Sequence, residues 1–348
     1  MEAKKLNKAT IIGHFGAGLE YYDGQTIKTK KVNNELKRCF GKRNIVTVDT
    51  HGGVRHLIMA PIIAWKSLRN SENVIMLPAQ NGLKVYAPLL TILKGNKATR
   101  LHYIVIGGWI PNVTKRNRLL RKCLMKFDGI YVETKTMKTA LEKQGFSNIV
   151  IMPNFKEEQE YSNIKRDYNQ PYKLCTFSRV MKEKGIEDAV NAVRSVNDKK
   201  QKTVFRLDIF GSVDEKQQEW FEKIKKLFED TICYKGSVKS DESTAVLSEY
   251  FALLFPTHFY TEGIPGTIID AYAAGVPVIC SKWESFSDIV DDGITGIGYD
   301  FNMADRLVDI LDIIADNPNI ILQMKDQCWK KFEEYTPNVA MKPLIDGM

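Results

Sequence analysis

Short apolar segments alternate with amphipathic segments along most of this chain of 348 residues. The apolar segments have the length of buried strands, and the segments between them place apolar residues at the spacing of one helix face. Such alternation predicts a parallel sheet with right-handed crossovers. The predicted strands are residues 9–13, 44–49, 73–77, 101–106, 129–133, 148–152, 174–178, 205–210, 232–234 and 296–299, with two more that end near 255 and 280. The predicted helices are residues 24–40, 57–69, 83–94, 115–127, 135–144, 185–196, 214–229, 241–248, 267–274, 284–291, 303–315 and 318–335.

The alternation stops once, at residues 154–171, which are polar and carry no apolar period. We therefore expect two doubly wound, Rossmann-like α/β domains, residues 1–153 and 172–335, joined by a linker at 154–171. Ligands of such sheets bind at the carboxyl ends of the strands, and we expect both domains to offer those ends to one central cleft. Residues 336–348 are expected to return to the first domain.

Composition limits the compartment and the cofactors. The sequence has no apolar run of about 18 residues, and its N-terminal segment lacks the pattern of a signal peptide. Its six cysteines are scattered, without a CxxC pair or a Cys/His cluster, which predicts free thiols in a reducing cytoplasm and no zinc site. We expect a cytoplasmic protein, either free or peripheral on the inner face of the cell membrane.

The net charge of +8 conceals an asymmetry. Residues 1–153 hold 26 Lys or Arg against 9 Asp or Glu (+17), whereas residues 154–348 hold 24 against 33 (−9). A basic half attracts phosphate-rich partners, such as an anionic membrane surface or a phosphorylated acceptor. The alternative is that these lysines are ordinary solvated residues on helix faces. Nucleic acid is disfavoured as a partner, because no nucleic-acid module is recognised and no aromatic residues interleave with the basic run.

The stretch 255–280 carries the strongest functional signal. It predicts a buried strand, a loop, a short helix, a Gly-Val-Pro stop and a second strand. The loop 262–266 leads to a helix N-terminus, where free N–H groups and the helix dipole favour a phosphate. Glu262 and Asp270 bracket this turn and offer carboxylates to sugar hydroxyls. The combination indicates a nucleotide-sugar site.

Two more motifs follow predicted strands. Residues 178–185 (SRVMKEKG) place Arg179 and Lys184 after one strand, and residues 13–18 (GHFGAG) form a glycine loop after the first strand. With the stretch 255–280, these motifs resemble those of retaining GT-B glycosyltransferases of the glycosyl transferases group 1 type, which include bacterial capsule, exopolysaccharide and lipopolysaccharide transferases. The resemblance implies a retaining, hexosyltransferase-like enzyme. Its donor would be a nucleoside-diphosphate sugar, and its acceptor a glycan, lipid-pyrophosphate-linked, in cell-surface polysaccharide biosynthesis.

The resemblance also implies roles for individual residues. Glu262 would contact the donor sugar, while Arg179 and Lys184 would hold the diphosphate and stabilise its developing charge. These three are the predicted catalytic residues. The predicted donor-binding residues are Gly16, Gly18, Gly211, Val238, Gly263, Ile264, Gly266, Thr267, Ile268 and Asp270. Asp270 would hold the ribose, although the family more often has glutamate there, and Thr267 would either cap the helix or bind a phosphate oxygen.

A metal-independent front-face mechanism is expected, in which the leaving phosphate oxygen takes the proton of the acceptor. The sequence has no obvious Asp-x-Asp metal motif, and no cofactor is expected beyond the donor substrate. Many relatives carry a histidine just after the fourth strand. His102 lies at the beginning of that predicted strand, about 13 Å too early along it, and is expected to be structural.

The predicted acceptor side consists of five residues. They are His14, Trp109, Arg118, Arg121 and Lys122. The last four lie in the segment 109–127, which has a basic remainder beside one apolar helical face, as in an interfacial helix. The predicted apolar face consists of Leu119, Leu120, Cys123, Leu124 and Phe127. A core-packed helix with a solvated basic face is the alternative.

Two other functions remain open on the same fold. The chain is either the expected transferase, a non-catalytic nucleotide-sugar-binding partner of another glycosyltransferase, or a nucleotide-sugar epimerase. Asp270 in place of glutamate and the missing histidine leave room for the non-catalytic alternative.

Overall fold

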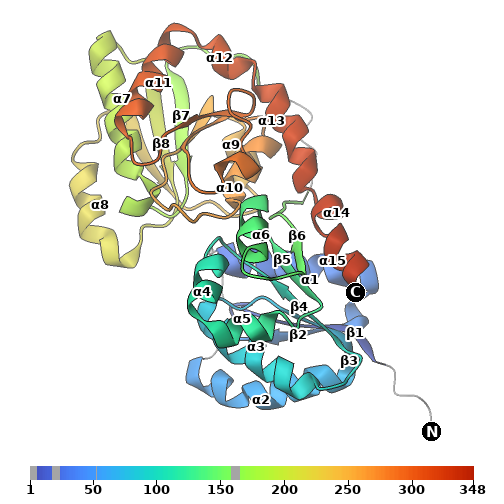
Figure 1. Cartoon of the computed structure of the whole chain (residues 1–348). Coiled ribbons are helices and arrows are strands. Elements are labelled where there is room, and N and C mark those ends of the chain that lie inside the picture. The colour runs from blue at the N-terminus through green and yellow to red at the C-terminus, as the bar shows by residue number, and fades with distance from the viewer. Residues whose placement is uncertain (1–5, 18–23, 52, 158–164) are drawn as a thin grey trace. The chain divides into compact units, whose positions relative to one another are not determined.

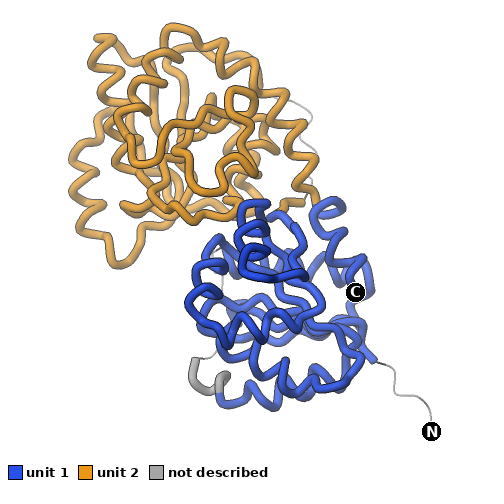
Figure 2. The backbone as a smooth tube through the Cα atoms, in the orientation of Figure 1, with its two compact units in different colours: residues 1–154, 337–348 blue, residues 155–336 orange. Residues whose placement is uncertain are grey.

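The computed structural model describes residues 6–17, 24–51, 53–157 and 165–348, with the backbone alone for 53–57. The chain divides into two compact units, one formed by Met1–Asn154 with Pro337–Met348, and the other by Phe155–Thr336 (Figure 2). Each unit contains a six-stranded sheet in which all paired strands are parallel. The α/β class predicted from the alternation is therefore confirmed.

Unit 1, whose helices and strands are labelled in Figure 1, has the strand order β2-β1-β3-β4-β5-β6. The strands are β1 (Asn7–Gly13), β2 (Ile45–Asp49), β3 (Ser71–Met76), β4 (Arg100–Ile104), β5 (Gly129–Val132) and β6 (Ile149–Ile151). The helices are α1 (Gly24–Phe40), α2 (Gly53–Asn70), α3 (Gln80–Lys94), α4 (Ile110–Arg116), α5 (Arg118–Leu124), α6 (Lys135–Glu142), α14 (Pro337–Ala340) and α15 (Lys342–Gly347), with a 3₁₀ turn η1 (Lys42–Asn44). The order reverses at β1 and β3, which makes their carboxyl ends the switch point where doubly wound sheets bind ligands.

Unit 2 has the order β12-β11-β10-β7-β8-β9. The strands are β7 (Tyr172–Phe177), β8 (Phe205–Phe210), β9 (Ile232–Gly236), β10 (Ala252–Phe255), β11 (Val278–Ser281) and β12 (Gly296–Tyr299). The helices are α7 (Ile186–Lys200), α8 (Gln218–Lys225), α9 (Ser243–Leu247), α10 (Gly266–Ala273), α11 (Asp305–Asp316), α12 (Asn319–Leu322) and α13 (Lys325–Phe332). Four 3₁₀ turns are η2 (Lys182–Lys184), η3 (Glu215–Gln217), η4 (Phe286–Asp288) and η5 (Glu333–Tyr335).

The apolar runs form strands because both faces of each sheet are covered. In unit 1, Ile11 of β1 is in register with Thr47 of β2 on one side and with Ile75 of β3 on the other. Ile11 and Ile75 are fully buried, as are Leu253 and Ile279 in the second sheet. Continuous apolar runs are the pattern expected of such doubly covered parallel strands.

Four predicted helices are wrong in their extent, among them 214–229, which is divided into η3 and α8 and ends at Lys225. The predicted helix 115–127 is divided at Asn117, whose side-chain oxygen accepts a hydrogen bond from the Leu120 amide at 3.0 Å and so starts a new helix. The predicted helix 284–291 is only the short turn η4. The predicted helix 318–335 is divided into α12, α13 and η5. This division allows Ile321 to pack in one apolar cluster and Cys328 in another.

The segment expected to be a linker, 154–171, has no helix or strand among its described residues, and two of its parts pack into unit 2. Phe155 and Lys156 are buried. Farther along, the Tyr168 hydroxyl donates a hydrogen bond to the Tyr250 carbonyl at 2.9 Å. The polar composition of the segment thus conceals several anchoring contacts.

At the other end of unit 2 the chain returns to unit 1, where α15 contacts β5. The carbonyl oxygen of Gly347 accepts a hydrogen bond from Arg100 at 3.0 Å, and that of Met348 accepts one from Lys8 at 3.3 Å. No helix in the described ranges combines the length and the apolar character needed to cross a bilayer.

Candidate functional site

Three predicted site residues of unit 2 follow neighbouring strands. β10, β7 and β8 are adjacent in the second sheet, and the loops after them carry Glu262, Lys184 and Gly211 respectively. Carboxyl ends of parallel strands meet at one edge of a sheet, so the topology gathers residues that are far apart in the sequence.

Lys184 and Glu262 form an ion pair, with each side chain 17% exposed. The Thr257 hydroxyl lies 3.4 Å from the same Oε1 of Glu262 and donates to it. The Lys184 ammonium also lies over the rings of Phe255 and Phe259, at 5.5 and 5.0 Å from their centroids. Aromatic faces attract a cation and restrict its position. The structure therefore brings together two residues that the sequence predicts to act on one donor.

A close backbone contact fixes the two loops that carry this pair. Gly185 has φ +67°, and a Cβ built there would lie 1.9 Å from the Pro256 carbonyl oxygen. The His258 amide donates to the Glu183 carbonyl at 2.8 Å. Only glycine accommodates both the positive φ and the contact. The two loops thus hold Lys184 and Glu262 in a defined geometry.

Arg179 is placed differently from Lys184. Its guanidinium pairs with Asp214 at 3.6 Å, and its side chain is 50% exposed. Gly211, on the neighbouring loop, has φ +133°, and a Cβ there would lie 1.8 Å from the Ser178 carbonyl oxygen. Gly211 therefore lets the β7 and β8 loops approach each other beside Arg179. Asp214 is a contact that no sequence motif indicated.

Helix α10 begins directly after the glycine loop. Its N-cap is Pro265, which supplies no side-chain cap, so Thr267 lies inside the helix and is not the cap. The Thr267 hydroxyl is buried and has no hydrogen-bond partner among the described residues. Gly263 and Ile264 are buried, whereas Gly266 is exposed. The first turn of α10 thus places helix-end amides, and beside them a buried hydroxyl without a partner among the described residues, at the position predicted for a phosphate.

Asp270, one turn farther along α10, is held on both carboxylate oxygens. Oδ1 pairs with the Lys156 ammonium at 2.8 Å, and Oδ2 accepts a hydrogen bond from the Ser243 hydroxyl at 2.7 Å. Lys156 is 5% exposed and also donates to the Ser240 carbonyl at 2.7 Å. The role of Asp270 in binding a ribose stays a prediction.

Val238 is half-buried and packs against the apolar cluster that contains Ile268.

Sequence reasoning missed Lys156 because it lies alone in a polar segment far from Asp270. It missed Thr257 as well, although a hydroxyl two residues beyond the buried strand β10 was a usable signal.

In unit 1, Asp49 organises the glycine loop that follows β1. Its carboxylate accepts hydrogen bonds from the amides of Phe15 at 2.8 Å, Ala17 at 2.6 Å and His51 at 2.9 Å. Partial burial opposes ionisation, but these three amides, with His14, outweigh it and lower the pKa of Asp49. The loop is sharply bent, since Gly16 has φ +81° and Ala17 has φ +46°. Gly18, predicted in the same loop, lies outside the described residues.

His14 points toward two neighbours. Its Nδ1 is 2.8 Å from the Thr26 hydroxyl, and its Nε2 is 3.1 Å from Nδ1 of His51. The two histidines come from the loops after β1 and β2, at the switch point of the first sheet. His51 was not indicated by any motif. The acceptor-side role of His14 stays a prediction.

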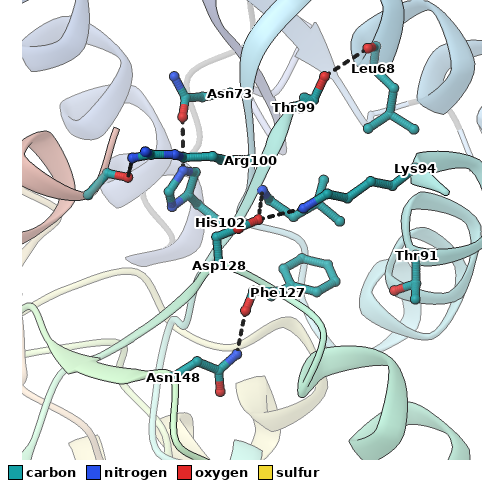
Figure 3. A network of polar contacts seen from close by, with 12 residues as sticks. Leu68, Asn73, Thr91, Lys94, Thr99, Arg100, His102, Phe127, Asp128 and Asn148 are labelled. Carbon is teal, nitrogen blue, oxygen red and sulfur yellow. Dashed lines mark hydrogen bonds and ion pairs between the residues drawn. The ribbon is translucent and has the colours of Figure 1, made fainter. Parts of the chain in front are cut away.

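His102 is structural, as expected, and more deeply buried than expected. It is 1% exposed. Figure 3 shows it pointing toward Asn73, whose Oδ1 is 3.0 Å from Nε2, and Nδ1 lies 3.2 Å from the Tyr131 hydroxyl. Burial lowers the pKa of His102 to about 4, against the opposing effect of Asp128. A neutral ring that accepts from Tyr131 and donates to Asn73 satisfies both nitrogens.

The segment 109–127 differs from the predicted single helix. The Trp109 ring donates to the Ile106 carbonyl at 2.8 Å, and its side chain packs against the core of unit 1. The predicted apolar face is wrong at Leu119, which is 67% exposed. Arg118 and Lys122 are exposed and Arg121 is half-buried. A helical wheel assumes one continuous helix, so it could not show that α4 ends before Asn117 and that α5 begins after it.

Across the described residues, no three His, Cys, Asp or Glu side chains gather in a way that could hold a metal ion.

Comparisons with known proteins add independent information. The chain is 30% identical over 139 residues to an uncharacterised 41.2 kDa protein in the cps region of Klebsiella pneumoniae, covering 40% of this chain and 36% of that protein. It is 25% identical over 189 residues to the putative colanic acid biosynthesis glycosyltransferase WcaL of Salmonella typhimurium, covering 50% and 45%. The chain thus spans less than half the length of these two relatives.

The fold is that of solved GT-B glycosyltransferases. HepE from Anabaena, crystallised with UDP and glucose, superposes with a TM-score of 0.76 over 97% of this chain and 98% of its own, at 11% identity. At that identity the likeness concerns the fold alone. The model of the family described as glycosyl transferases group 1 matches residues 133–331, which is more than half of the chain and includes Lys184, Glu262 and Asp270. The chain therefore belongs to the glycosyl transferases group 1 family.

Proposed function

We propose that this protein transfers a sugar from a nucleoside-diphosphate sugar to a lipid-linked glycan acceptor during cell-surface polysaccharide biosynthesis, with retention of configuration and without a metal ion. The observation that carries the proposal is the Lys184–Glu262 pair beside the first turn of α10, within the segment matched by the family. The relatives from a cps region and from colanic acid biosynthesis support the polysaccharide context.

The charges around the pair suit a diphosphate leaving group. Departure of a diphosphate from the anomeric carbon places negative charge on its oxygens, and fixed cations stabilise that charge. Lys184 and Arg179 supply two cations from the β7 loop, and the start of α10 adds backbone N–H groups. A diphosphate beside Lys184 would compete with Glu262 for the ammonium. Glu262 would then be available to accept hydrogen bonds from the donor sugar.

The reaction breaks the bond between the anomeric carbon and the diphosphate oxygen, and forms a bond from that carbon to the acceptor oxygen. When both events occur on the same face, the configuration is retained, and the leaving phosphate oxygen takes the acceptor proton. This chemistry needs no side-chain base. Arg179 and Lys184 would therefore act on the leaving group, and Glu262 would orient the sugar.

Uridine diphosphate is the first donor nucleotide to test, because HepE was crystallised with it. The full-length protein is incubated with UDP-hexoses, with and without a polyprenyl-pyrophosphate-linked glycan, and released UDP and products are measured. Transfer releases UDP and extends the acceptor only when the acceptor is present. Conversion of the donor without acceptor identifies an epimerase, and binding without turnover identifies a non-catalytic partner.

Two additions test the mechanism. The anomeric configuration of the product, determined by NMR, should match that of the donor, and inversion would contradict the front-face route. Chelation with EDTA should leave the rate unchanged. A rate that falls with EDTA and recovers with a divalent cation would contradict metal independence.

A further inference from the structure

Helix α2 is apolar on two opposite faces. At about 100° per residue, Ala60, Ala64 and Leu68 fall on one face, and all three are buried in the core of unit 1. A helix on the surface of a soluble domain normally turns polar residues to the opposite side. In α2 that side carries four large, exposed apolar side chains, which we call the α2 outer stripe. They are Ile58, Met59, Ile62 and Trp65, which are 71%, 43%, 46% and 44% exposed.

The stripe is unusual for this molecule. The other large apolar side chains that are exposed in the described ranges are spread over several elements, such as Ile313 on α11 and Val339 on α14. Single exposed apolar residues are ordinary on protein surfaces, whereas a contiguous apolar patch indicates an interaction. Burial of this stripe requires something other than the described residues of unit 1, because the core of unit 1 already covers the opposite face of α2.

The charge around the stripe has one sign. Residues 50–127 contain 13 Lys or Arg and a single acidic residue, Glu72, which pairs with Lys8 at 3.2 Å. Helices α2, α3, α4 and α5 contain no Asp or Glu. On α2 itself, Lys66 and Arg69 are exposed, and the Arg69 guanidinium lies over the Trp65 ring at 5.2 Å.

The neighbouring helices extend this basic surface. α3 contacts α2, and α5 contacts α3, so the three helices form one layer of unit 1 (Figure 1). Lys84 on α3 and Arg118 and Lys122 on α5 are exposed, as are the apolar Ile92 and Leu119. The layer therefore combines exposed apolar side chains with uncompensated positive charge, which is the composition of surfaces that lie in a membrane interface.

We propose that the α2 outer stripe docks on an anionic lipid bilayer, with its apolar side chains inserted at the headgroup boundary and Lys66 and Arg69 on the lipid phosphates. The stripe is distinct from the segment 109–127. A second copy of the chain is a poor occupant, because an isologous contact would place basic surface against basic surface. This docking does not depend on the transfer reaction, so vesicle binding tests it without a sugar donor.

The experiment measures co-sedimentation of the full-length protein with phosphatidylcholine vesicles, with or without phosphatidylglycerol. The wild-type protein should bind only the anionic vesicles, and added salt should weaken binding. The double variant Ile58→Ser/Ile62→Ser should lose at least about tenfold in partition coefficient, because it removes two inserted aliphatic side chains. The control Ile313→Ser changes a residue of unit 2 that is 57% exposed, and it should bind like the wild type.

A second readout uses Trp65 directly. Brominated lipid should quench part of the tryptophan fluorescence of the wild type, and the Trp65→Phe variant should lose that part. Equal vesicle binding by wild type and double variant, or quenching unaffected by Trp65→Phe, would overturn the proposal. So would a vesicle-independent dimer that the double variant abolishes, or binding to an acidic protein without binding to vesicles.

Discussion

Gly185 and Pro256, in the loops that follow β7 and β10, lie in backbone contact, so that a methyl group on Gly185 would approach the Pro256 carbonyl oxygen to 1.9 Å. The residue before Gly185 is Lys184, and Pro256 begins the loop that carries Glu262. The contact thus sets the spacing of the two loops whose charged residues form the proposed donor site.

Gly185→Ala should therefore disturb both stability and activity. The positive φ and the clash with Pro256 together should cost more than about 2 kcal/mol of unfolding free energy, measurable by urea denaturation. Gly293→Ala is the matched control, since Gly293 has φ +79° but open space around it. This control should lose only about 1 kcal/mol. Equal losses for the two variants would show that the contact with Pro256 is unimportant.

Lys184→Met should weaken nucleotide binding. If the Lys184 ammonium holds the diphosphate, its removal should raise the Kd for UDP at least tenfold, since a charged hydrogen bond contributes roughly 1.5–3 kcal/mol. Titration calorimetry measures this directly. Lys182→Met removes an exposed lysine from the same turn and should leave the Kd unchanged. An unaltered Kd in Lys184→Met would place the diphosphate elsewhere.

The buried pair of Lys156 and Asp270 should show strong energetic coupling. Lys156→Met leaves the Asp270 carboxylate, which is 13% exposed, without its cation and should cost roughly 3 kcal/mol of stability. The double variant Lys156→Met/Asp270→Asn should recover part of that loss, with a coupling of roughly 1–3 kcal/mol in a double-mutant cycle. Additive losses would mean that the pair does not interact in solution.

His102 should make the protein less stable in acid. Its pKa is about 4 in the folded protein against 6.5 for an unperturbed histidine, so the unfolded chain binds the extra proton between these values. Stability should fall as the pH drops from 6.5 toward 4, by up to about 3 kcal/mol. The His102→Gln variant should lose most of this dependence.

A direct check is the NMR titration of the His102 ring. Its resonance should remain that of a neutral imidazole at pH 5.5. A titration midpoint near pH 6.5 would show that the ring is accessible to water or paired with a negative charge.

The sequence predicted the fold well where local pattern and topology agree. Helix α1 begins and ends where its apolar spacing indicates, at 24 and 40, and the strand at 205–210 is reproduced as β8. The predicted extent of a helix was wrong where a single side chain ends one helix and begins another. Asn117 divides a segment whose apolar spacing continues through it, because its side chain caps the next helix.

The candidate site was predicted only in part. Lys184 and Glu262 stand in recognisable motifs after adjacent strands, and the structure joins them. The partners of Asp270 were not predictable, because Lys156 lies 114 positions away in a segment without periodicity. Such pairs depend on the tertiary fold, and a sequence motif carries no information on them.

The most direct test of the central claim is the rate of acceptor-dependent UDP release by Glu262→Gln. If Glu262 orients the donor sugar against Lys184, this nearly isosteric change should lower kcat/KM at least about a hundredfold, equivalent to about 2.7 kcal/mol, while circular dichroism shows that the protein stays folded. Glu222→Gln, at an exposed position on α8, should retain full activity. A Glu262→Gln enzyme within threefold of the wild-type rate would contradict the account.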